Sequence, residues 1–141
     1  MRHKNSVSQI NLERDKELLR IFRKATELAG NPATLVRIFT IAACLPVSKF
    51  YISDYWACRY IHNRLKGKAK KFKNRHKQIL YNALFAEYCQ LSKRAENRNK
   101  SFETLVDMAL ERPAPIIGLS PHSLKDIIRY RLNIKQYNDR K

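Results

Sequence analysis

A basic run, RLKGKAKKFKNRHKQ, is the segment whose side chains are best suited to bind another molecule, and it spans residues 64–78. No acidic residue occurs between Asp54 and Glu87, so nothing nearby in the sequence neutralises these charges. Lysines and arginines spaced in this way can neutralise the phosphates of a nucleic acid without reading its bases. We therefore predict that the run provides affinity for a phosphate backbone. A charged linker exposed to water is the alternative interpretation.

Two expected helices, which start after Ser53 and Ser120, carry side chains that could read bases. Arginine and asparagine form paired hydrogen bonds with guanine and adenine in the major groove. The Gly-Leu-Ser entry to the second of these helices resembles a helix-turn-helix motif. Pro113 and Pro115 exclude an intact helix just before it, so the motif is helix-turn-helix-like only. The alternative is an amphipathic helix whose polar face contacts water.

Together the run and the two helices define the predicted nucleic-acid-binding residues. These are Arg59, Asn63, Arg64, Lys66, Lys68, Lys70, Lys71, Lys73, Arg75, Lys77, Lys125, Arg129 and Arg131. Aromatic residues cluster beside them at Phe50, Tyr51, Tyr55, Trp56 and Tyr60. Such a cluster could stack on bases, but we expect it to belong mainly to the core, with Tyr51 and Tyr55 the most exposed.

Residues suited to catalysis are sparse. Cys58 and His62 lie four apart on an expected helix, yet the sequence has no Cys-x-x-Cys pair to complete a zinc site. Ser120 and His122 read as a helix cap and its first turn rather than as a nucleophile and its base. Paired carboxylates and a glycine-rich phosphate loop are both missing from the sequence. We predict a protein that is not an enzyme and that needs no metal or cofactor.

The composition points to one basic helical domain. The chain has 141 residues, of which 44% are hydrophobic, and only three are glycines. Its formal net charge of +17 favours a polyanionic partner: DNA or RNA, or alternatively an acidic protein. No apolar run is long enough to span a membrane, and the amino-terminal residues do not resemble a signal peptide. We expect a cytoplasmic protein with reduced cysteines.

Apolar spacing and breaker residues predict about six helices. The first runs from Leu12 to Gly30, and the next starts at Asn31-Pro32 and ends at Pro46. An extended connector then leads to the helix capped by Ser53. In the second half a long helix spans residues 77–97, Ser101 caps a short one, and a second connector leads to the helix at Ser120-Pro121.

The two halves resemble each other. The stretches LPVSKFYISDYWACRYIHNRL and RPAPIIGLSPHSLKDIIRYRL share their prolines, serines and final Arg-Leu at a spacing of 67 residues. Upstream, Thr34-Leu35-Val36 matches Thr104-Leu105-Val106 at a spacing of 70, which predicts a middle helix three residues shorter in the second half. We interpret this as an internal duplication. Two capping patterns that arose independently are the alternative.

A resemblance to known proteins rests on NLERDKELLRIF, LPVSKFYIS and RPAPIIGLS, and it spans roughly residues 11–132. In these motifs the chain resembles a group of uncharacterised small basic proteins of Bacteroides-type bacteria and their phages. The second half departs from the group's pattern, because Ile116 and Ile117 stand where aromatic residues are expected. The resemblance implies a bacterial or phage origin and transfers no functional residues.

These observations predict an all-α protein of two tandem helix-turn-helix-like three-helix units related by a pseudo-two-fold axis. The expected parts are a flexible start (1–11), a first repeat (12–67), a basic linker (68–76), a second repeat (77–133) and a flexible tail (134–141). The predicted function is non-enzymatic nucleic-acid binding, with double-stranded DNA as the favoured partner. The alternative is a phage or mobile-element assembly module that docks an acidic partner.

Overall fold

The fold is known from a computed structural model, which describes the backbone of residues 7–132 and the side chains of residues 9–129. The helices of this part of the chain are α1 (Val7–Ala29), α2 (Leu35–Ala42), α3 (Asp54–Leu65), α4 (Arg75–Ser92), α5 (Phe102–Leu110) and α6 (Pro121–Asp126). A short 3-10 turn, η1 (Ala95–Asn97), follows α4, and a π-helical segment, η2 (Ile127–Leu132), continues α6. The predicted all-α fold of about six helices is confirmed.

Side-chain caps set where most helices start. The hydroxyls of Ser53, Ser101 and Ser120 accept hydrogen bonds from backbone amides at the start of α3, α5 and α6, as predicted. The prediction that the second helix starts at Asn31-Pro32 is wrong. Thr34 is extended and its hydroxyl accepts from the amide of Arg37 at 3.1 Å, so α2 starts at Leu35.

The first and fourth helices also differ from the predicted bounds. Helix α1 already begins at Val7, so residues 7–11 of the expected flexible start are helical, while residues 1–6 and 133–141 lie outside the described part. Asn74 caps α4 through the amide of Lys77, which places the start of α4 at Arg75. Its end at Ser92 precedes the expected end at residue 97.

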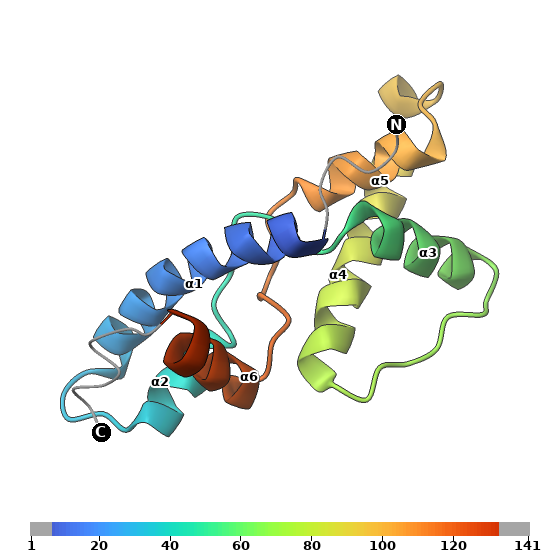
Figure 1. Ribbon diagram of the computed structural model, residues 1–141. Coiled ribbons are helices and arrows are strands. Elements are labelled where there is room, and N and C mark those ends of the chain that lie inside the picture. Colours follow the sequence, from blue (N-terminus) through green and yellow to red (C-terminus); the bar gives the residue numbers. More distant parts are fainter. Residues whose placement is uncertain (1–6, 133–141) are drawn as a thin grey trace.

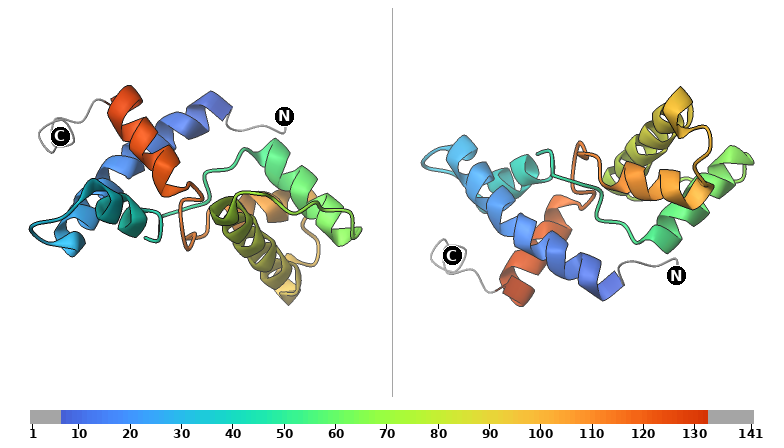
Figure 2. Two further views of the ribbon diagram at one scale, coloured as in Figure 1. Left: turned by 90° about the horizontal axis from the view of Figure 1, so that it is seen from below. Right: turned by 90° about the horizontal axis from the view of Figure 1, so that it is seen from above.

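The helices form two lobes (Figure 1). The first lobe contains α1, α2 and α6 with η2, and the second lobe contains α3, α4 and α5. The third helix of each half therefore packs against the helices of the other half. Two extended segments carry the chain between the lobes, the first connector (residues 43–53) and the second connector (residues 111–120), as two further views show (Figure 2).

The two connectors meet through a pair of backbone hydrogen bonds. The amide of Val47 donates to the carbonyl of Ala114, and the amide of Ala114 donates to the carbonyl of Val47, each at 3.0 Å. The amide of Phe50 also donates to the carbonyl of Leu110, where α5 ends. Val47, Phe50 and Ala114 are all buried, so one continuous core links the lobes through the crossing.

Val47 and Ala114 occupy positions 67 residues apart, the spacing noted between the two halves. The capping residues Thr34 and Ser101 have the same spacing. The expected shortening of the second middle helix is wrong, because α5 has nine residues and α2 has eight. The duplication itself stays a prediction.

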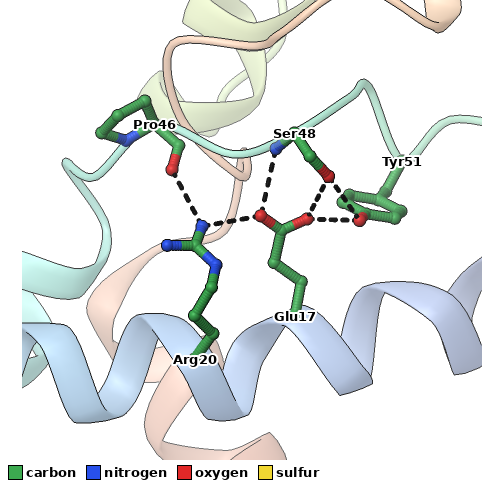
Figure 3. A network of polar contacts seen from close by, with 5 residues as sticks. All are labelled: Glu17, Arg20, Pro46, Ser48 and Tyr51. Atoms are coloured by element: carbon green, nitrogen blue, oxygen red, sulfur yellow. Dashed lines mark hydrogen bonds and ion pairs between the residues drawn. The ribbon is translucent and has the colours of Figure 1, made fainter.

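A network of polar contacts around Glu17 fixes the first connector to α1 (Figure 3). Its carboxylate accepts hydrogen bonds from the amide and hydroxyl of Ser48 at 3.0 and 2.8 Å. The Tyr51 hydroxyl also donates to it, and Arg20 donates at 2.7 Å. Arg20 reaches the carbonyl of Pro46 as well, at 3.4 Å. Donors from both the helix and the connector therefore converge on one carboxylate.

Burial and hydrogen bonding act on Glu17 in opposite directions. Burial alone would raise the pKa of its carboxyl, but the hydrogen bonds from Tyr51, Arg20 and Ser48 together hold that pKa below its ordinary value of 4.5. Burial and the hydrogen bond to Glu17 raise the pKa of Tyr51 to about 12, so its hydroxyl remains a donor at neutral pH. Tyr51, expected to be exposed, is half-buried by these contacts.

We predict that Glu17→Gln lowers the free energy of unfolding by about 1–3 kcal/mol at pH 7, because charged hydrogen bonds are lost. With a depressed pKa in the native state, the carboxylate of the parent protein contributes stability above pH 4.5 that is lost as the pH falls below this value. Urea unfolding between pH 7 and pH 3 should show the two proteins converging. Glu27→Gln, on the exposed face of the same helix, should leave the pH dependence unchanged. An equal effect of both changes would contradict the stabilising role of the Glu17 carboxylate.

A second prediction concerns Gly118 of the second connector. Its φ of +89° is unfavourable for other residues, and an added Cβ would lie 2.5 Å from the Leu80 Cδ2 atom of α4. Gly118→Ala should therefore cost about 3 kcal/mol of unfolding free energy, from backbone strain and overpacking.

Gly30 supplies the matched control, since its φ is +75° but no atom lies within 4 Å of the added Cβ. Gly30→Ala should cost only about 1 kcal/mol. Urea midpoints measure both changes. Equal losses would show that the connector does not press against α4.

Candidate nucleic-acid interface

The basic loop (residues 66–74) leaves α3 and returns to α4 in a path fixed by backbone contacts. The amide of Lys68 donates to the carbonyl of Asn63 at 2.8 Å, which folds the loop's start back on α3. The amide of Phe72 donates to the Gln78 side chain at 2.7 Å, which ties the loop's middle to α4. The Asn74 cap then starts the helix. The loop is thus a positioned part of the second lobe.

A cavity of about 440 Å³ lies between α3, the basic loop and α4. Its lining residues are Trp56, Arg59, Tyr60, Asn63, Lys68, Ala69, Lys70, Phe72, Lys77 and Tyr81. We call this cavity the α3–α4 pocket. The lining contains four cationic side chains, several aromatic rings and no acidic residue, so its electrostatic potential favours an anion.

Three aromatic rings pack together in the wall of the pocket. The Tyr60 and Phe72 rings are stacked with centroids 5.8 Å apart, and the Tyr81 ring lies 4.9 Å from Tyr60 and 4.7 Å from Phe72. These separations are typical of stabilising aromatic pairs. Burial and the neighbouring Tyr60 raise the pKa of Tyr81 to about 12, so its hydroxyl is protonated at neutral pH.

Two of the four cations that line the pocket, Arg59 and Lys77, lie against aromatic rings. The Lys77 Nζ atom lies 4.8 Å from the centroid of the Phe72 ring. The Arg59 guanidinium lies 5.9 Å from the centroid of the Trp56 ring and donates to the Tyr55 hydroxyl at 3.2 Å. Among residues 9–129, no ion pair involves Arg59, Lys68, Lys70 or Lys77. Their charges are available to an anionic ligand.

The structure brings together part of the predicted site. Five predicted residues line the pocket: Arg59, Asn63, Lys68, Lys70 and Lys77. Four more are exposed around it, on the loop or the start of α4: Lys66, Lys71, Lys73 and Arg75. Lys125 and Arg129 lie on α6 and η2 of the first lobe, where both are half-buried, and the side chain of Arg131 lies outside the described residues. The third helices belong to different lobes and do not build one surface.

Arg64 holds the second lobe together. Its guanidinium donates to the Tyr60 hydroxyl at 2.9 Å and to the Asn82 side chain at 2.8 Å, and it lies 4.4 Å from the centroid of the Phe85 ring. Asn82 also accepts from Gln78, the residue that holds the loop. This chain of contacts joins α3, α4 and the loop, which is a positioning role.

We predict that Arg64→Ala lowers the free energy of unfolding by about 1–2 kcal/mol, because two hydrogen bonds and a cation–π contact are lost. Lys66→Ala, an exposed neighbour, should change it by less than about 0.5 kcal/mol. Urea unfolding measures both. Unchanged stability of the Arg64 variant would contradict the positioning role and favour direct contact with a ligand.

Sequence patterns do not identify every residue of the pocket. Apolar spacing places Trp56 on the buried face of its helix, yet 51% of its surface is exposed at the pocket. Tyr81 and Ala69 have no charge or spacing that marks them as part of a site. Of these three residues, only Trp56 could have been assigned to the site from the sequence. It lies three residues before Arg59 and therefore near the same face of α3.

Comparisons with protein-family models, with curated proteins and with solved structures give no match to this chain. Within the described residues, no three His, Cys, Asp or Glu side chains gather where they could hold a metal ion. No helix of that part has the length and apolar character needed to cross a membrane.

Proposed function

We propose that the protein binds nucleic acid through the basic loop and the α3–α4 pocket. What supports this proposal is the run of exposed cations along the basic loop, which form no ion pair within residues 9–129. Lys68, Lys70, Lys71 and Lys73 project from a fixed loop, and no acidic residue occurs between Asp54 and Glu87. A phosphate backbone is the common biological polyanion that matches such a row of exposed charges.

The proposed surface is narrower than the one expected from the sequence. It uses α3, the loop and the start of α4, all in the second lobe, and it excludes α6 and η2. On α3, Arg59 and Asn63 face the pocket, whereas Arg64 is engaged with Tyr60 and Asn82. We retain Arg59, Asn63, the lysines of the loop and Lys77 as the contacting residues.

A test compares two variants that each remove four positive charges. The first changes Lys68, Lys70, Lys71 and Lys73 to alanine. The second changes Lys16, Arg23, Lys24 and Arg37, which are exposed on α1 and α2 of the first lobe. Both reduce the net charge equally, so a difference between them reports a localised surface rather than general attraction.

We expect the loop variant to weaken binding to a fluorescently labelled oligonucleotide at least tenfold, measured by anisotropy at about 0.1 M salt. The slope of log affinity against log salt should fall by roughly 0.7–0.9 for each phosphate contact removed. The first-lobe variant should lose much less.

Two results would contradict the proposal. Equal losses in both variants would mean that net charge alone attracts the strand. Equal affinity for a polyglutamate peptide of the same charge would favour an acidic protein partner instead.

A further inference from the structure

The α3–α4 pocket has features that a phosphate backbone alone does not require. A flat row of lysines suffices to bind phosphates, yet here the lysines surround a cavity of about 440 Å³ with aromatic walls. This volume lies within the range of roughly 300–1,000 Å³ that is typical of small-ligand pockets. Cations and aromatic rings in one lining correspond to the two parts of a nucleotide, its phosphate and its base.

Trp56 supplies the ring most accessible to a ligand. Trp56 is 51% exposed, whereas Tyr60, the other α3 ring in the lining, is buried. The Tyr55 ring meets the Trp56 ring edge to face at 5.1 Å, and the Arg59 guanidinium lies 5.9 Å from the centroid of the Trp56 ring. Exposed aromatic side chains beside cations are the common platform on which unpaired bases stack.

Polar groups in the same pocket suit the edge of a base. Within residues 9–129, neither the Asn63 side-chain amide nor the Tyr81 hydroxyl has a hydrogen-bond partner, and both residues line the cavity. An amide offers a donor and an acceptor side by side, and a hydroxyl offers either. Asn63 is half-buried, so a ligand that bonds to these two groups would replace water there.

We propose that the pocket binds one unpaired nucleobase of a single strand, stacked on Trp56, while the neighbouring phosphates contact Arg59, Lys68, Lys70 and Lys77. This inference rests on the proposed function and adds to it the kind of nucleic acid recognised. A base inside a duplex is paired and stacked, and it can enter such a pocket only at the cost of a few kcal/mol for unpairing. Single strands should therefore bind more tightly than duplexes.

Trp56 is the only tryptophan of the chain, so its fluorescence reports on the pocket without a label. The full chain is titrated with a single-stranded DNA 12-mer, with the blunt duplex of that sequence, and with a 12-mer of abasic sites. We expect the single strand to quench Trp56. The abasic strand should bind roughly five- to hundred-fold more weakly and should not quench, because stacking is lost while the phosphates remain.

Variants separate the base from the phosphates. Trp56→Ala should weaken the single strand by a similar factor, measured by anisotropy of a labelled strand, and should not affect the abasic strand. Trp56→Phe should restore most of the affinity. Leu65→Ala removes an exposed apolar side chain from the same helix outside the pocket, and it should have no effect.

The possible failures are distinguishable. Equal affinity for the single strand, the duplex and the abasic strand, with no quenching of Trp56, would overturn the base pocket and leave phosphate binding intact. The absence of binding to all three strands at low salt would overturn the proposed function together with this inference. Equal weakening by Trp56→Ala and Leu65→Ala would likewise overturn the role of the pocket.

Discussion

The pair of hydrogen bonds between Val47 and Ala114 is the constraint on which the arrangement of this protein depends. It fixes the point where the two connectors cross. Beyond the crossing, the third helix of each half, α3 or α6, packs on helices of the other half. Helix α3 thereby packs on α4 and α5 rather than on α1 and α2. The α3–α4 pocket exists because of this exchange, since its walls are α3 and the amino-terminal part of α4.

Local interactions are predictable from the sequence because they depend on neighbouring residues. A serine hydroxyl reaches an amide three residues ahead, so the places of Ser53, Ser101 and Ser120 along the chain are enough to assign them as caps. The same rule gives the wrong cap at Asn31, because the residue that caps α2 is Thr34, three positions later. The exchange of third helices is not predictable, because apolar spacing shows which face of a helix is buried but not which helix covers it.

In the candidate site, too, some features are predictable from the sequence and others depend on tertiary packing. Charge is a property of composition, so the basic run is visible at once, and the structure places it on an exposed loop. The roles of single side chains depend on distant partners. Arg64 is held by Asn82, eighteen residues away, and Tyr51 by Glu17, thirty-four residues away. Neither contact produces a pattern in the spacing of residues along the sequence. The exposure of Trp56 likewise depends on the position of α4 in the fold.

The exchange also determines the order in which the protein can be completed on the ribosome. Helices α1 and α2 are synthesised before the segments that cover them, α6 on α2 and η2 on α1, which begin only at Pro121. Most of the chain has therefore emerged before the first lobe can close. A nascent chain that exposes apolar surface for this long is a ready substrate for chaperones. Slow or interrupted translation after residue 120 would leave α1 and α2 prone to aggregation.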